Sequence, residues 1–332
     1  MTGAFAFGCS GPDLRADERD FFRASSPWGF ILFARNCESP LQLCRLTGAL
    51  RDAVGGDVPI LIDQEGGRVQ RMGPPHWDAY MPALDQMRRA GDHWREAMIL
   101  RSRLIADELS AVGIDVNCTP LADLVEPQTH PVLLNRLYGE TPERVVAAAR
   151  AVVEGQLMQG VLPVLKHVPG YGRASLDGHL ELSRLTQPLE ELEVRDFAPF
   201  RALSDLRMAM TAHIVVEALD ADRPATISPA VIRHVREEME IDAFLMTDDI
   251  SMEALSGTVA ERGAASLAAG CDLVLHCNGD LAEMETVAAL APLTQAAQAR
   301  SDRALAERRA PEPLDRAEAK ARLAALLDPP AA

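Results

Sequence analysis

Residues 160–182 have the sequence GVLPVLKHVPGYGRASLDGHLEL. The apolar run at positions 161–165 predicts a short buried strand, and a cation and an imidazole, Lys166 and His167, follow it directly. The proline and the glycines of the next segment, VPGYG, break regular structure and therefore predict a loop. A strand that ends in polar side chains beside a loop is the arrangement expected where a scaffold meets a substrate.

The same loop carries a carboxylate and an imidazole, Asp177 and His179, two residues apart. Alternate side chains share a face in an extended segment, so these two groups can lie side by side. A neighbouring carboxylate orients an imidazole and changes its proton affinity, which makes the pair a candidate acid–base dyad. A zinc site formed by His167, Asp177 and His179 is an alternative, but their spacing differs from the familiar zinc patterns and we expect no metal.

The composition argues against several classes of protein. The chain has 332 residues and a formal net charge of −16, from 49 acidic and 33 basic side chains. Nucleic acids and anionic membranes bind basic faces, so neither is an expected partner. The N-terminal segment lacks the features of a secretory signal, and no window approaches the roughly 20 apolar residues of a membrane span. The six cysteines lack zinc-ribbon spacing, and we expect reduced thiols in a cytoplasmic protein.

Short apolar runs alternate with longer helical segments along the whole chain. The expected strands lie at 4–8, 30–34, 59–62, 115–119, 161–165, 208–211, 244–247 and 273–275. Continuously apolar strands that alternate with helices are typical of a parallel sheet covered by helices. Eight such units predict a (β/α)8 barrel of the TIM type, with a doubly wound sheet as the alternative. No linker divides the chain, so we expect one domain, 1–332, with a C-terminal helical extension from about residue 300.

Local signals predict where several helices begin and end. Ser39, Thr141 and Ser228 are placed to cap helix N-termini, and Gly270 is placed to end an alanine-rich helix. A further helix is expected at about 190–203. We expect these helices to cover the sheet.

Polar side chains fall at the C-terminal ends of the predicted strands. They are Arg35, Asp63, Lys166, His167, His213, Asp248 and His276. The carboxyl ends of barrel strands meet at one rim, and that rim carries the active site in barrels of this type. We therefore expect a site there, with His213 as a possible lining residue. A structural role is the alternative for His213 and His276.

The motif IDQEGGRVQR at residues 62–71 places Asp63 at a strand end and Arg71 eight residues later. A carboxylate and a guanidinium on one loop can bind neighbouring sugar hydroxyls, because one accepts and the other donates hydrogen bonds. A structural ion pair below the rim is the alternative. Arg136, in the segment LLNRLYG, follows the fourth strand on a long loop, where a binding role and a solvated surface role are both open.

The motif FLMTDDISMEAL at residues 244–255 ends an apolar strand in two adjacent carboxylates. Burial of a carboxylate is costly unless it is paired or used. Successive strand side chains point to opposite faces, so only one of the two can point into the site. We predict that Asp248 does so, and that Asp249 pairs locally or caps the next turn.

Together, IDQEGGRVQR, the KH-x-PG-x-G segment with its downstream D-x-H, and the TDDISM strand end resemble glycoside hydrolase family 3. Within it they are most similar to the single-domain bacterial β-N-acetylhexosaminidases of peptidoglycan recycling. The resemblance covers nearly the whole chain. It implies a retaining enzyme that releases terminal β-linked N-acetylglucosamine from (anhydro)muropeptides through a covalent glycosyl-enzyme intermediate. Roles in cell-wall biogenesis or degradation, cell shape and cell division would follow.

The resemblance also implies roles for single residues. Asp248 would be the nucleophile, His179 the general acid/base and Asp177 its dyad partner. The residues implied to bind the terminal sugar are Asp63, Arg71, Arg136, Lys166 and His167. No metal or organic cofactor is implied, and a muropeptide carbohydrate is the expected partner of a cytoplasmic monomer.

The sequence departs from the family pattern in the loop. Family members often read KHFPGHG, whereas Val168 and Tyr171 stand here, and Gly178 lies between the two dyad residues. Gly178 adds backbone freedom to the loop. The alternatives are a family 3 β-glycosidase or phosphorylase of other sugar specificity and an inactive sugar-binding homologue.

Overall fold

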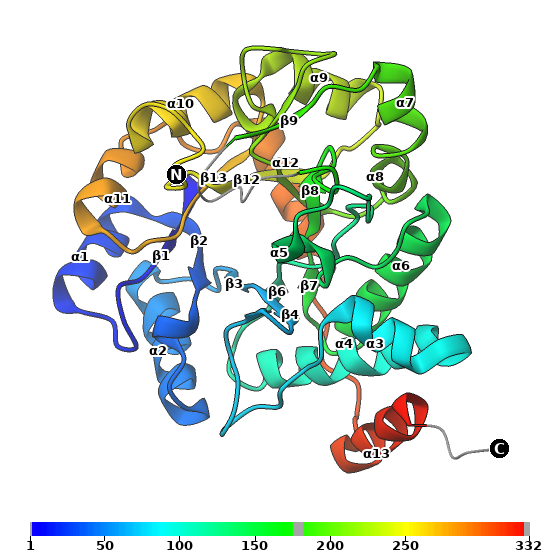
Figure 1. The fold of residues 1–332 in the computed structure, drawn as a ribbon. Helices are drawn as coiled ribbons and strands as arrows, with labels where there is room; N and C mark the ends of the chain where they lie inside the picture. Colours follow the sequence, from blue (N-terminus) through cyan, green and yellow to red (C-terminus); the bar gives the residue numbers. More distant parts are fainter. Residues whose placement is uncertain (1, 175–181, 329–332) are drawn as a thin grey trace.

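The computed structural model describes residues 2–174 and 182–328. Its main sheet has nine strands, and every neighbouring pair in it is parallel. Strand order around the sheet follows the order along the chain, and helices surround the sheet on its outer side (Figure 1). The strands are β1 (Gly3–Gly8), β2 (Pro27–Leu32), β3 (Ile60–Ile62), β6 (Val116–Asn117), β7 (Leu162–Pro163), β8 (Leu165–Val168), β10 (Met208–Thr211), β12 (Phe244–Asp249) and β13 (Leu273–His276).

The sheet curves into a nearly closed barrel with eight strand positions. The two strands at the ends of its order, β7 and β8, are separated in sequence by Val164 alone and share the position predicted for the fifth strand. A parallel bridge between Leu121 and Lys166 continues the pairing beside β8. The chain therefore forms the (β/α)8 barrel predicted from its eight apolar runs.

Two small sheets lie outside the barrel. One pairs β4 (Gln64–Gly66) with β5 (Val69–Gln70) in antiparallel fashion, and the other pairs β9 (Ser183–Leu185) with β11 (Ile214–Val216) in parallel fashion. β4 begins one residue after Asp63, so this small sheet extends the loop that follows β3.

Helices pack around the barrel, and most of them form its outer layer (Figure 1). They are α1 (Ala16–Ser25), α2 (Pro40–Val54), α3 (Ala83–Ala90), α4 (Trp94–Ser110), α5 (Pro131–Leu134), α6 (Pro142–Met158), α7 (Leu189–Val194), α8 (Ala198–Ala202), α9 (Pro229–Glu237), α10 (Val259–Ala269), α11 (Leu281–Ala288), α12 (Gln295–Leu305) and α13 (Arg316–Leu327), with short 3-10 turns η1 (Ala34–Asn36), η2 (Gly91–His93) and η3 (Ala225–Ile227). In the described part of the chain, none of these helices has the length and apolar content needed to cross a membrane.

The predicted helix ends are confirmed where capping chemistry determines them. Ser39, Thr141 and Ser228 each accept a backbone N–H in the first turn of the helix that follows. Gly270 ends α10 in the left-handed conformation, at a φ of 111°. Short polar side chains and a glycine thus set these boundaries locally.

Other predicted boundaries are wrong. Residues 30–34 are predicted as the second strand, but β2 ends at Leu32, and the 3-10 turn η1 follows it. Residues 190–203 are predicted as one helix, but two short helices, α7 and α8, occupy this range. The break between them contains Asp196, whose buried carboxylate is paired with Arg173 at 2.9 Å, so a tertiary contact interrupts the helix.

Strand side chains alternate between two buried clusters. Ile31 and Leu61 belong to a cluster inside the barrel, whereas their neighbours Phe30, Ile60 and Ile62 belong to a cluster beneath the helices. Successive side chains of a strand point to opposite faces, so this pattern buries both faces of the sheet. The rim is then the part of the barrel at which polar side chains can meet solvent.

Candidate active site

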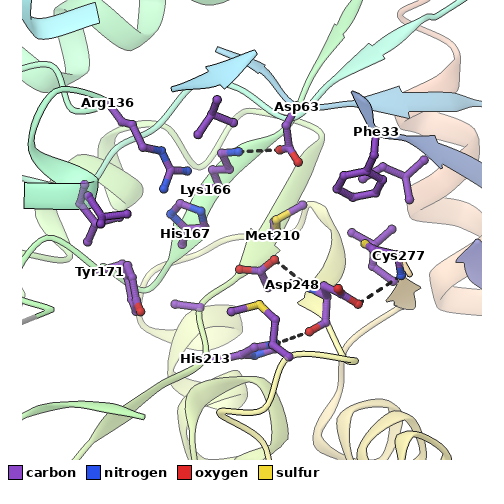
Figure 2. A pocket seen from close by; sticks show the side chains of 18 of the residues that line it. Phe33, Asp63, Arg136, Lys166, His167, Tyr171, Met210, His213, Asp248 and Cys277 are labelled. Carbon is purple, nitrogen blue, oxygen red and sulfur yellow. Dashed lines mark hydrogen bonds and ion pairs between the residues drawn. The ribbon is translucent and has the colours of Figure 1, made fainter. Parts of the chain in front are cut away.

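A pocket of about 150 Å³ opens at the C-terminal ends of the barrel strands (Figure 2). Its apolar walls include Phe33, Met210 and Cys277. The structure brings seven of the predicted site residues into its lining. They are Asp63, Arg71, Arg136, Lys166, His167, His213 and Asp248.

Two carboxylates and three cations form a connected network on one side of the pocket. Lys166 Nζ lies 2.8 Å from Asp63 Oδ1 and 2.7 Å from Glu65 Oε1. Arg136 donates two parallel hydrogen bonds to Glu65, at 2.8 and 2.9 Å. Arg71 Nη2 lies 3.3 Å from Asp63 Oδ2. Arg136, whose side chain is 15% exposed, is therefore a paired member of the network, and the solvated surface alternative for it is wrong.

The network keeps its members charged at neutral pH. Burial alone would raise the pKa of the two carboxyl groups, but the adjacent cations outweigh burial. Lys166 and Arg71 hold the pKa of Asp63 well below its usual range, and Arg136 and Lys166 lower the pKa of Glu65 to about 2. Burial would lower the pKa of Lys166, yet Asp63 and Glu65 raise it above its usual value. The pocket therefore presents a fixed set of charged donors and acceptors, suited to hydroxyl groups.

His167 lies beside this network and is held by a carboxylate that sequence reasoning missed. Its Nδ1 is 2.8 Å from Asp123 Oδ2. Asp123 Oδ1 also accepts the backbone N–H groups of His167, at 3.4 Å, and Tyr171, at 2.7 Å. Asp123 is 2% exposed, so these groups are bound away from solvent.

Asp248 and Asp249 end β12 and have different surroundings. Asp249 Oδ1 accepts the backbone N–H groups of Ser251, at 3.0 Å, and Cys277, at 3.1 Å, and Oδ2 accepts from the Ser251 hydroxyl at 2.7 Å. Asp249 thus pairs locally, as predicted. Asp248 Oδ1 accepts the N–H of Asp249 at 2.8 Å, and its carboxylate lies across the pocket from Lys166 (Figure 2).

His213 lines the pocket and has both ring nitrogens in hydrogen bonds. Nδ1 is 2.8 Å from Thr226 Oγ1, and Nε2 is 2.9 Å from the backbone oxygen of Asp249. These bonds link the end of β12 to the 3-10 turn η3. His213 therefore supports the position of the Asp248–Asp249 pair.

Two of the seven rim side chains do not belong to the pocket. His276 is fully buried, and its Nε2 lies 3.0 Å from Glu283 at the start of α11. Arg35 donates to the backbone oxygens of Cys9 and Cys277. His276 thus has the structural role that was its alternative, and Arg35 holds backbone groups. A strand end fixes the height of a side chain at the rim but not the direction in which it points.

The predicted dyad, Asp177 and His179, lies outside the described residues, as does the departure at Gly178. Two of the three residues of the zinc alternative lie there as well. Within residues 2–174 and 182–328, no group of three His, Cys, Asp or Glu side chains is arranged to hold a metal ion.

Glu65 and Asp123 are the site residues that sequence reasoning missed. Glu65 is two residues after Asp63 on an extended segment, so the alternation rule could have placed it on the same face. Asp123 follows β6, but its partners are His167 in β8 and Tyr171 after it, 44 residues or more away. The sequence offers no signal for the contacts of Asp123 with these distant partners.

Comparisons with known proteins identify the family of the chain. Residues 14–308 match the family described as "Glycosyl hydrolase family 3 N terminal domain". The chain belongs to glycoside hydrolase family 3. A "Beta-hexosaminidase" of Methylococcus capsulatus is 39% identical over 277 residues, 82% of each chain, and one of Pseudomonas aeruginosa is 34% identical over 87% of each chain.

The family 3 barrel also matches solved structures over its whole length. NagZ from Neisseria gonorrhoeae, crystallised in complex with N-trifluoroacetyl-D-glucosamine, gives a TM-score of 0.86 at 28% identity and covers 98% of both chains. The predictions of family, enzyme class and barrel fold are therefore confirmed: this family 3 chain is a glycoside hydrolase related to β-hexosaminidases.

Proposed function

We propose that this protein is a retaining β-N-acetylglucosaminidase that releases terminal β-linked N-acetylglucosamine from (anhydro)muropeptides in cell-wall recycling. The observation that carries the proposal is the pocket, in which the Asp248 carboxylate lies across from the Asp63–Lys166 pair (Figure 2). A sugar ring between them would meet hydroxyl-binding groups on one side and a nucleophile on the other. The curated relatives named above are β-hexosaminidases, and the Neisseria enzyme holds an N-acetylglucosamine analogue.

In this proposal the charged network binds the terminal sugar. Asp63 accepts hydrogen bonds from hydroxyl groups, whereas Arg71, Arg136 and Lys166 donate them. Each side chain is already held by a partner in the network, so little side-chain entropy is lost when the sugar binds. Glu65 does not contact the sugar in this proposal but holds Arg136 and Lys166 in place.

The reaction proceeds in two displacements. Asp248 attacks the anomeric carbon while His179 protonates the departing glycosidic oxygen, and a covalent glycosyl-enzyme forms. His179 then takes a proton from water, which attacks the anomeric carbon and releases the sugar. An imidazole suits this role because its unperturbed pKa lies near neutrality, and Asp177 would hold its tautomer.

No metal or organic cofactor enters this scheme. The carboxylate and imidazole supply the nucleophile and the proton transfers. We propose that the chain works as a single catalytic domain and a cytoplasmic monomer, with the carbohydrate as its partner.

A substrate panel tests the proposal. We expect hydrolysis of an aryl N-acetyl-β-glucosaminide and of N-acetylglucosaminyl-anhydromuramyl peptide, with little turnover of an aryl β-glucoside. Preference for the glucoside would overturn the sugar specificity. Formation of N-acetylglucosamine 1-phosphate in phosphate buffer would make the enzyme a phosphorylase, and inertness toward the whole panel would make it a sugar-binding homologue.

A further inference from the structure

One buried carboxylate contacts the KHVPGYG segment at three points. Asp123 lies on the loop after β6, with Oδ2 at 2.8 Å from His167 Nδ1. Oδ1 accepts the backbone N–H groups of His167 and Tyr171, at 3.4 and 2.7 Å. Asp123 is 2% exposed and is not part of the pocket lining, so it acts on the pocket through the residues that it holds.

The contact to Nδ1 has a chemical consequence for His167. An ionised carboxylate accepts hydrogen bonds and donates none, so Nδ1 must carry a proton. In a neutral imidazole the other nitrogen, Nε2, is then an acceptor. His167 lines the pocket, and its Nδ1 is engaged by Asp123, which leaves Nε2 as the ring nitrogen available to a ligand.

We propose that Asp123 is a positioning residue, which fixes the Nδ1–H tautomer of His167 so that Nε2 accepts a hydrogen bond from a substrate hydroxyl. This inference rests on the proposed function, because the substrate is a sugar. Next to His167, Lys166 and Arg136 only donate hydrogen bonds. A sugar hydroxyl both donates and accepts, so an acceptor beside these two cations complements it.

The other carboxylate oxygen of Asp123, Oδ1, holds the backbone of the loop that follows His167. The N–H of Tyr171 binds Oδ1, and Tyr171 lies at the start of the segment that leads to residues 175–181. Tyr171 also lines the pocket, and its ring lies 5.8 Å from the His167 ring, centroid to centroid. One carboxylate thus sets the proton position on His167 and the backbone position of the next lining residue.

The substitution Asp123→Asn separates these two roles. The new amide oxygen can still accept the N–H of Tyr171, while the new NH₂ group faces Nδ1 and donates to it. Nδ1 must then accept, and the proton of the neutral ring moves to Nε2. Asp272→Asn controls for the loss of a buried carboxylate elsewhere in the barrel: Asp272 is 5% exposed, accepts the N–H of Leu245 at 2.9 Å, pairs with Arg236 and Arg300, and lies outside the pocket lining.

The tautomer of His167 is tested directly by a long-range ¹H–¹⁵N correlation spectrum of the histidine rings, recorded at a pH where the rings are neutral. The signals of His167 are assigned by comparison with the spectrum of a His167→Gln variant. We expect the Nδ1–H tautomer in the wild-type protein and in Asp272→Asn, and the Nε2–H tautomer in Asp123→Asn. An Nε2–H tautomer of His167 in the wild-type protein would overturn the inference, whatever the Asp123→Asn variant shows.

Kinetics on an aryl N-acetyl-β-glucosaminide give the second readout. We expect Asp123→Asn to lower kcat/KM about tenfold, mainly through KM, because the lost hydrogen bond is made before the transition state. Asp272→Asn should keep wild-type values. In a His167→Gln background Asp123→Asn should cause no further loss, and an undiminished further loss would contradict the assigned route through His167. A wild-type protein that fails to cleave the substrate would refute the proposed function but leave the tautomer measurement intact.

Discussion

The substitution Glu65→Gln tests how much the charge network beside the pocket stabilises the fold. The Glu65 side chain is 4% exposed and binds Arg136 twice and Lys166 once. Its pKa is lowered from 4.5 to about 2, because the two cations outweigh the effect of burial. At about 1.4 kcal/mol per tenfold change in proton affinity, that difference corresponds to about 3 kcal/mol of folding free energy at neutral pH.

Glutamine keeps the shape of the side chain but removes its charge. We therefore expect Glu65→Gln to lower the free energy of unfolding by about 3 kcal/mol at pH 7, measured by urea denaturation. Glu154→Gln is the control, because Glu154 is about half exposed in its ion pair with Arg95, and we expect a loss below about 1 kcal/mol.

The pH dependence of the Glu65→Gln difference follows from the sign of the pKa change. A carboxyl group with a lowered pKa in the folded state stabilises the protein above its unfolded pKa, and this stabilisation is lost as the pH falls through the folded pKa. The difference in the free energy of unfolding between wild type and variant should thus have its full value above pH 4.5 and become smaller as the pH falls toward 2. A difference below about 1 kcal/mol at pH 7, or one that is constant with pH, would refute the reasoning.

Three further predictions concern single groups. Asp248→Ala should abolish turnover of an aryl N-acetyl-β-glucosaminide, and wild-type-like rates would exclude Asp248 as the nucleophile. His179→Ala should reduce kcat/KM far more for substrates with poor leaving groups than for activated aryl glycosides, and equal losses would argue against an acid role. Burial raises the pKa of Glu108 to about 7. The stability of the wild type relative to Glu108→Gln should therefore be greatest below pH 4.5 and fall as the pH rises through 7, and thermal melts that show no such trend would contradict it.

The sequence predicts the barrel because its strands are buried on both faces. Continuous apolar runs at eight places identify the strands, and capping residues such as Ser39 and Thr141 identify helix starts through contacts within three residues. The break at Asp196 is different, because it depends on Arg173, 23 residues away. Helix boundaries that depend on neighbouring residues can thus be predicted from the sequence. Boundaries that depend on residues far along the chain cannot.

The same distinction applies to the site. The places of Asp63, Lys166 and Asp248 in the site could be predicted from the strand ends and the motifs, because the barrel brings those strand ends to one rim. His276 satisfies the same criterion but faces α11, since the strand end alone does not fix the direction of a side chain. Asp123 could not be predicted, because its role depends on contacts of the loop after β6 with His167 in β8 and with Tyr171, which only the closed barrel brings together.

The central claim is that Asp248 is the group that attacks the sugar. A fluorinated N-acetylglucosaminyl fluoride, which forms the covalent intermediate faster than it releases it, labels that group directly. After proteolysis and mass spectrometry, we expect one sugar adduct, on Asp248, and no adduct in Asp248→Ala. An adduct on Asp249, on Asp63 or on any other residue would contradict it.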